Sequence, residues 1–440
     1  MANADLLLRL FLQLAVILAA CRLVGMVARR IGQAQVVGEM VAGVLLGPSL
    51  FGLLLPTVQQ WLFPLKATVG GQTITHPSMA ILYVIGHVAV ALYMFLVGLE
   101  FNTNLIRGHG KHASAISAGG ILVPFLLGGV IALLIYQQGG LFGQGISLGS
   151  AALFLGASMC ITAFPVMARI VQEHHLERTR LGTLVLTTAS IDDISAWCLL
   201  AIVLATVKNS ALSALITIGG GLFYVVFMLT LGRRGLRVFD HVTERKGVIS
   251  KEMLSLVLLV VLICSWFTSQ IGIYEVFGAF VAGLAMPRGW FADQVRKRLE
   301  GLTTGLLLPI FFVFSGLNTQ LGLLKTPTLW IIGGVIILAA TAGKGLACGL
   351  GARFAGMSWR ESAAVGSLMN ARGLVELILI NIGLEQGIIT PTLFTILVIM
   401  ALITTLMASP LLRFFYGSVL KSQAPTSEEG SETTPAVATG

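Results

Sequence analysis

Uninterrupted apolar stretches of about twenty residues recur along almost the whole chain. An α-helix needs about twenty apolar residues to cross the hydrocarbon core of a bilayer, which is about 30 Å thick. Charged residues make up only 11% of the chain and hydrophobic residues 56%, whereas soluble domains carry about 25% charged residues. So few charges could not cover the surface of a soluble fold. The sequence therefore predicts an all-α polytopic membrane protein.

Polar loops divide the chain into about thirteen predicted membrane spans. The chain contains 51 glycines, and glycine is common in closely packed membrane helices. The predicted spans are 4–27, 33–54, 78–100, 114–136, 148–171, 181–206, 209–232, 252–269, 272–288, 302–324, 328–351, 359–384 and 390–416.

The net charge of +9 comes from basic residues that gather in alternate loops. With the N-terminus placed outside, the opposite, outer loops carry only Lys66, Lys208 and Lys325. This bias follows the positive-inside rule, and it predicts an outer N-terminus and a cytoplasmic C-terminus. The basic character therefore reflects topology, and no nucleic-acid partner is expected. The loops assigned to the cytoplasm carry Arg29, Arg30, Arg107, Lys111, Arg178, Arg180, Arg233, Arg234, Arg237, Arg245, Lys246, Arg296, Lys297 and Arg298.

The cysteines and the C-terminal residues indicate neither a disulfide framework nor a further domain. All five cysteines lie in predicted spans, and none has a CxxC or other metal-type spacing, so disulfide and zinc roles are not expected. Residues 419–440 are polar, low in complexity and free of aromatic side chains. They predict a disordered cytoplasmic tail after a transmembrane domain at 1–418.

Two pairs of segments indicate an internal repeat. VVGEMVAGVLLGPSLFG (36–52) parallels YEVFGAFVAGLAMPRGW (274–290), and FLVGLEFN (95–102) parallels FVFSGLNTQ (312–320). The copies are offset by seven predicted spans, an odd number, so the second copy is inverted in the membrane. We expect repeats at about 4–206 and 252–416, joined by a linker helix at about 209–232. Inverted repeats are typical of secondary transporters, which bind their substrate near the midplane.

The repeat pairs two spans that are both predicted to be interrupted. Span 148–171 contains Pro165, which removes a backbone donor and clashes with the preceding turn. Broken helices at membrane depth occur only where they line a cavity or are buried in protein, and their half-helix ends offer dipoles that can compensate ions and side chains. The equivalent span, 359–384, is interrupted by Asn370, Arg372, Gly373 and Glu376.

Two adjacent acids, Asp192 and Asp193, are the only charged residues between Leu181 and Val207. Consecutive helical residues point about 100° apart, so the two carboxylates cannot face the same partner. Lys344, in TAGKG, is the expected cation for one of them. The other acid remains free to bind H⁺ or a small hard cation through its oxygen atoms. If the proton and the cation compete for this one site, that competition is sufficient for their exchange across the membrane. A buried ion-pair network that only sets helix register is the alternative.

The motifs VVGEMVAGVLLGPSLFG, FLVGLEFN, SIDDISAW, TAGKG and SLMNARGLVELILINIGLEQGII together resemble the second family of monovalent cation:proton antiporters. The resemblance covers about residues 10–415. It implies an inverted-repeat, sodium/proton-antiporter-like fold of thirteen helices with two crossed broken helices. It also implies a homodimer formed by a scaffold domain, and a core domain that moves in an elevator-like manner.

Residue by residue, the resemblance implies that Asp193 binds the transported cation or the proton and that Asp192 pairs with Lys344. It places Thr162 at the first helix break, where its oxygen atoms would assist the ion. No cofactor is expected, and the transported ions are H⁺ and Na⁺ or K⁺. Arg372 and Glu376 lie one turn apart and should pair with each other or with Glu100, in a structural or gating role.

Other functions lack matching features in the sequence. A sodium-coupled symporter of a small organic solute is the main alternative, because it shares inverted repeats and broken helices. A channel would need an acidic ring or a filter-like segment. The chain lacks HExxH and GxSxG motifs, so it is not expected to be an enzyme. The family's distribution favours a bacterial inner membrane and leaves an organelle open.

Overall fold

The computed structural model describes residues 3–69, 72–100, 104–176, 179–207, 211–244 and 249–423. Across these residues the protein is almost entirely helical, with a single antiparallel pair of strands, β1 (Lys66–Val69) and β2 (Gln72–Thr75). Within the same residues, ten helices are long and apolar enough to cross a membrane. The remaining three predicted spans correspond to helices that are short or interrupted. The predicted all-α polytopic membrane fold is confirmed.

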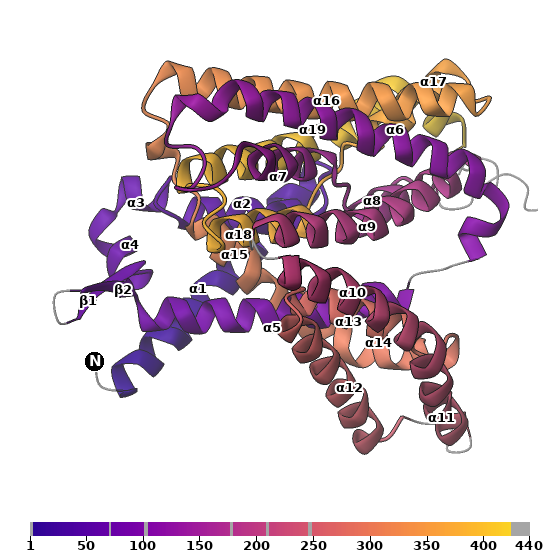
Figure 1. The fold of residues 1–440 in the computed structure, drawn as a ribbon, viewed down its shortest axis with the longest axis horizontal. Helices are drawn as coiled ribbons and strands as arrows, with labels where there is room; N and C mark the ends of the chain where they lie inside the picture. The colour runs from indigo at the N-terminus through magenta and orange to yellow at the C-terminus, as the bar shows by residue number, and fades with distance from the viewer. Residues whose placement is uncertain are drawn as a thin grey trace, which may run out of the picture.

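The helices pack into two groups. We call the first the scaffold group: α1 (Asn3–Arg30), α2 (Gln35–Leu46), α5 (Pro77–Glu100), α12 (Lys251–Gln270), α13 (Glu275–Ala285), α14 (Trp290–Leu302) and α15 (Leu308–Leu317). We call the second the core group: α6 (Asn104–Ile135), α7 (Leu148–Cys160), α8 (Phe164–Glu173), α9 (Arg180–Val207), α16 (Pro327–Phe354), α17 (Trp359–Leu368), α18 (Leu374–Glu385) and α19 (Pro391–Gln423). In Figure 1, α6, α16 and α17 run along the upper side, and α5, α12 and α13 lie below them.

Shorter elements connect these helices. The core and scaffold groups are joined by α10 (Ala211–Phe227), a π-helical turn (Met228–Gly232) and α11 (Arg233–Glu244). The described part of the predicted linker helix, 211–232, coincides with α10 and the π-helical turn. Between α2 and α5, the chain forms α3 (Phe51–Leu54), α4 (Pro56–Leu62) and the two strands. The basic segment 296–298, which the sequence predicts as a loop, is instead helical within α14, because a second π-helical turn (Thr303–Leu307) continues α14 directly into α15.

Equivalent glycines of the two repeat copies allow equivalent helix crossings. In the first crossing, α2 meets α15 where a Cβ added to Gly316 would lie 2.2 Å from the carbonyl carbon of Gly43. In the second, α5 meets α13 where a Cβ added to Gly98 would lie 2.3 Å from the Phe280 oxygen and 3.0 Å from Gly283. Only glycine permits such close backbone approach. Gly43 and Gly283 both follow VA in the matched segments, so each crossing joins one copy to the other.

Both predicted helix breaks are present. α7 ends at Cys160 and α8 begins at Phe164, with residues 161–163 extended between them. α17 ends at Leu368 and α18 begins at Leu374. The breaks touch, because the Ala163 amide donates to the Ala371 carbonyl at 3.2 Å. Helix α19 extends to Gln423, so the first residues of the predicted tail are helical, and residues 424–440 lie outside the described part of the chain.

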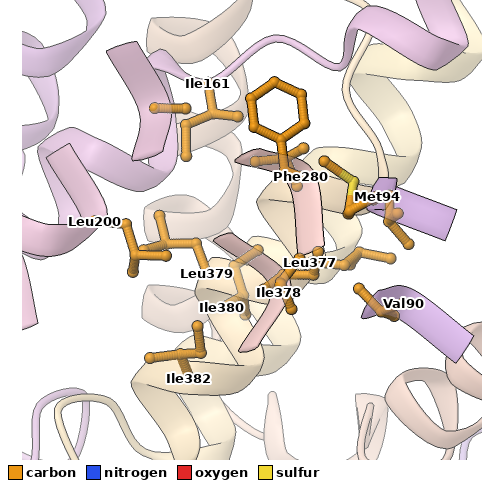
Figure 2. Packing of buried hydrophobic residues seen from close by; sticks show 14 of the residues in the cluster. Val90, Met94, Ile161, Leu200, Phe280, Leu377, Ile378, Leu379, Ile380 and Ile382 are labelled. Carbon is orange, nitrogen blue, oxygen red and sulfur yellow. The ribbon is translucent and has the colours of Figure 1, made fainter. Parts of the chain in front are cut away.

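An apolar layer lies where α18 of the core group faces α5 and α13 of the scaffold group. Figure 2 shows Val90 and Met94 of α5 and Phe280 of α13 on the side of α18 that carries Leu377 and Ile378, whereas Leu379 and Ile382 point to the other side. All of these side chains are at most 3% exposed. Along α18, these apolar residues lie between Glu376, next to the helix break, and Glu385, at the other end.

Candidate functional site

The site forms where the two broken helices cross beside the middle of α9. Each break leaves backbone groups without helical partners, which must be satisfied by other parts of the protein. At the second break, the Arg372 amide donates to the Thr405 hydroxyl at 3.0 Å, and that hydroxyl lies 2.9 Å from the Arg372 carbonyl oxygen. Side chains from α9 and α16 complete the site around the first break.

Asp192 is fully compensated inside the protein. Its Oδ2 lies 3.0 Å from Lys344 Nζ, and both side chains are 0% exposed. The Thr162 hydroxyl donates to the same oxygen at 2.7 Å, and the Ser117 hydroxyl donates to Oδ1 at 2.5 Å. Lys344 also donates to the Cys160 carbonyl at the end of α7. An ion pair buried to this degree persists only with such additional hydrogen bonds. Asp192 therefore has no oxygen without a donor.

Asp193 has a different environment from its neighbour. It is 1% exposed, and its Oδ1 accepts from the Phe164 amide at the start of α8 at 3.4 Å. A helix N-terminus carries a partial positive charge that favours a carboxylate. Its Oδ2 has no hydrogen-bond partner among the residues that the structure describes. Because a buried oxygen without a partner is costly, Oδ2 is suited to bind a proton or a cation.

Arg372 connects the two breaks. Its side chain is 0% exposed and donates to the carbonyls of Ser158 at 3.0 Å and Met159 at 2.5 Å. These carbonyls belong to the last turn of α7, where the helix dipole is negative and a cation is stabilising. Arg372 also pairs with Glu376 at 3.2 Å. The second predicted partner, Glu100, lies instead at the end of α5, where it pairs with Arg296 at 2.9 Å, so the structure does not bring it to Arg372.

Sequence reasoning missed Ser117. This serine lies in α6, far in the sequence from every motif of the site, and no local pattern distinguishes it from the other small polar residues of that helix. Its contact with Asp192 arises because α6 packs against both α9 and α16. Only the tertiary packing could have revealed it.

Comparisons with known proteins identify the family of the chain. The model of the family described as sodium/hydrogen exchanger, transmembrane, matches residues 15–416. The chain belongs to the sodium/hydrogen exchanger family. The predicted membership is thereby confirmed, and members of this family are transporters rather than enzymes. The protein is an integral membrane protein.

Individual relatives differ in how much of their length the chain covers. It is 40% identical over 416 residues to the Na⁺/H⁺ antiporter NhaS4 of Synechocystis sp., covering 94% of this chain and 98% of that protein. It is 33% identical to cation/H⁺ antiporter 15 of Arabidopsis thaliana, covering 95% of this chain and 49% of that one. The chain thus spans about half the length of the plant relative.

A solved structure has the same fold. The sodium proton antiporter MjNhaP1 from Methanocaldococcus jannaschii superimposes with a TM-score of 0.65 at 18% sequence identity, covering 95% of this chain and 99% of that one. At this low sequence identity, the structural similarity supports a shared fold.

The donor set at the crossing suits a hard monovalent cation and not a transition metal. Among the described residues, no group of three or more His, Cys, Asp and Glu side chains is placed to hold a metal ion. The oxygen atoms near Asp192 and Lys344 come from the Ser117 and Thr162 hydroxyls and the Cys160 carbonyl, and oxygen is the ligand that hard cations prefer.

Proposed function

We propose that this protein is a secondary active antiporter that exchanges a monovalent cation for protons, with Asp193 as the shared binding site. The observation that carries the proposal is the contrast between two adjacent acids. Every oxygen of Asp192 has a donor, whereas Asp193 Oδ2 has none among the described residues. One carboxylate is thus held as part of the structure, and the next can exchange its ligand.

Competition at a single carboxylate is sufficient for exchange. A proton on Asp193 removes the charge that a cation needs, and a bound cation excludes the proton. If the core group moves only when Asp193 holds a proton or a cation, each movement of the core group carries one of these ions across the membrane in one direction. Asp192, Lys344 and Thr162 position the site: the Lys344–Asp192 pair joins α16 to α9, and the Thr162 hydroxyl joins the first break to the same carboxylate. The extended backbone at 161–163 offers further oxygen atoms near the ion.

The finer features follow from the same proposal. Relatives are named as Na⁺/H⁺ and K⁺/H⁺ antiporters, so the cation is Na⁺ or K⁺. The distribution of basic residues supports an outer N-terminus and a cytoplasmic C-terminus, and we place the protein in a bacterial inner membrane. The scaffold group would form a homodimer, and the core group would move against it.

Reconstitution into liposomes tests the function directly. A trapped pH-sensitive dye should report proton movement when Na⁺, K⁺ or Li⁺ is added, and the order of response identifies the cation. Asp193→Asn should abolish the response while the protein remains folded. Glu100→Gln, which removes a carboxylate distant from the crossing, is the matched control and should retain it. Wild-type exchange in Asp193→Asn would refute the assignment, and solute uptake without proton movement would favour a symporter.

A further inference from the structure

A second polar cluster lies at the far end of α18, outside the site described above. His87 of α5 places Nδ1 at 2.5 Å from Glu275 Oε1 and Nε2 at 3.5 Å from Glu385 Oε1. The hydroxyls of Tyr83 and Tyr274 donate to the other oxygen of Glu385 at 3.2 and 3.4 Å. Three scaffold side chains therefore converge on one carboxylate of the core group.

The geometry requires a charged histidine for the full set of contacts. Both ring nitrogens face carboxylate oxygens, and only the protonated imidazole carries an N–H on each nitrogen. The side chains of His87, Glu275 and Glu385 are 18%, 22% and 25% exposed, so water reaches them. A cavity of about 290 Å³, lined by His87, Glu275 and Ser265 among others, borders the cluster.

The cluster and the apolar layer of Figure 2 lie next to each other along the same two helices, α5 and α18. On α5, Val90 and Met94 follow His87 by one and two turns, and on α18, Ile378 precedes Glu385 by about two turns. The loop after α18 lies at the same end of the bundle as the loop before α7, because the Gly143 amide donates to the Ile388 carbonyl at 3.0 Å. Under the proposed orientation this is the outer end.

We propose that His87, Glu275 and Glu385, with Tyr83 and Tyr274, form an outer latch that joins the core group to the scaffold group and closes the path from the outside to the ion site. This inference rests on the proposed antiport function, because it assumes that the core group moves against the scaffold. For the site to face outward, Glu385 must leave its scaffold partners before the apolar layer parts. Loss of the second proton of His87 releases one of its two carboxylate contacts, so the latch weakens as the outer pH rises. The described titratable side chains that face His87 are Tyr83, Glu275 and Glu385. Tyr274 contacts Glu385, and Gln386 and Ser269 add neutral contacts to Tyr274 and Glu275.

A buried reporter cysteine tests the latch without relying on transport. In a background without the five native cysteines, Ile378→Cys places a thiol at a position that is 3% exposed, on the side of α18 that faces Val90 in Figure 2. A membrane-impermeant maleimide added outside sealed proteoliposomes should label this thiol slowly. Glu385→Gln should raise the labelling rate by about tenfold, since a hydrogen bond to a charged group commonly contributes a factor of this size. Raising the outer pH should also increase the rate, and His87→Gln should remove that dependence.

Matched controls separate the latch from general loosening. Glu100→Gln breaks an ion pair that lies within the scaffold group, so it should leave labelling of the reporter unchanged. A thiol at Val257, which is fully buried in α12, should remain unlabelled in every variant. Equal labelling in Glu385→Gln and its parent would overturn the latch. If the reporter disturbs folding, hydrogen exchange of α18 in otherwise native protein replaces it, with faster exchange expected in Glu385→Gln and equal exchange contradicting the proposal.

The two proposals fail in different ways. The labelling comparison is repeated in an Asp193→Asn background, which the proposed function makes inactive in transport. A tenfold difference that persists there supports the latch independently of ion exchange. Transport by Asp193→Asn would refute the ion site and leave the labelling result standing. Unchanged labelling together with loss of transport in Asp193→Asn would refute the latch alone.

Discussion

The two broken helices occupy equivalent places in the repeat, yet they satisfy their exposed backbone in different ways. The first break, 161–163, has no charged residue of its own, and Lys344 of α16 and Arg372 of the second break reach the carbonyls at the end of α7. The second break, 369–373, contains Arg372, and Thr405 binds its backbone. The first break is thus completed by charged side chains from elsewhere in the chain, whereas the second supplies its own arginine and takes a neutral hydroxyl from α19.

The helices that follow the breaks show the same difference. The amide at the start of α8 donates to Asp193, which belongs to α9. The first turn of α18 contains its own acid, Glu376, which Arg372 neutralises. A carboxylate supplied from another helix can change its ligand without unfolding the break. This comparison supports placing the proposed ion site at the first break, whereas the second break holds a buried ion pair.

The largest expected effect is that of Arg372→Ala, because this side chain serves both breaks. The substitution leaves Glu376 buried without its cation and removes the donor to the last carbonyls of α7. The free energy of unfolding in detergent should therefore fall by about 5 kcal/mol, the upper end for a broken buried pair. Thermal unfolding followed by fluorescence measures the change. Arg296→Ala, which breaks a largely exposed pair, should cost about 1 kcal/mol or less. Equal losses in the two variants would contradict the role of Arg372 in joining the breaks.

Lys344→Ala should come next, and it affects the first break alone. Asp192 keeps its bonds from Thr162 and Ser117 but loses its cation, so we expect a loss of about 3 kcal/mol in stability. Asp192→Asn combined with Lys344→Gln should recover part of that loss, since no unpaired charge remains. Thermal unfolding is measured in the same way for Lys344→Ala, for Asp192→Asn and for the double variant. Full stability of Lys344→Ala would show that the pair contributes nothing.

Thr405→Val tests the second break without altering a charge. It leaves the Arg372 amide without its hydroxyl acceptor, which should cost about 2 kcal/mol, the typical penalty for a buried donor left unpaired. Because the first break is untouched, cation affinity in the liposome assay should remain that of the wild type. A large fall in cation affinity would show that the two breaks are not independent.

Ser117→Ala should have the smallest effect. Asp192 retains Lys344 and Thr162, so the loss is that of one hydrogen bond, about 1 kcal/mol. Ser117→Thr keeps the hydroxyl and serves as the matched variant. No measurable difference between the alanine and threonine variants would indicate that the Ser117 hydroxyl does not support Asp192.

Much of this protein followed from its sequence because the bilayer restricts what a chain can form. Apolar length predicted the helices, and the matched segments at 36–52 and 274–290 indicated a repeat, whose glycines Gly43 and Gly283 lie at two helix crossings in the structure. Pro165 and the polar run around Asn370 marked both helix breaks. Two acids in one apolar helix pointed to the site, since their burial needs a compensating partner.

The choice between partners required the tertiary structure. The sequence alone left two possible partners for Arg372, Glu376 and Glu100. The fold decides between them, because it places Glu100 beside Arg296. It likewise could not reveal Ser117 at Asp192, or His87 between Glu275 and Glu385, because each contact joins helices that are far apart in the chain. Periodicity and spacing report which residues share a helix and which segments cross the membrane. Which side chains meet across helices depends on crossing angle and register, and these are set by the packing of the whole bundle.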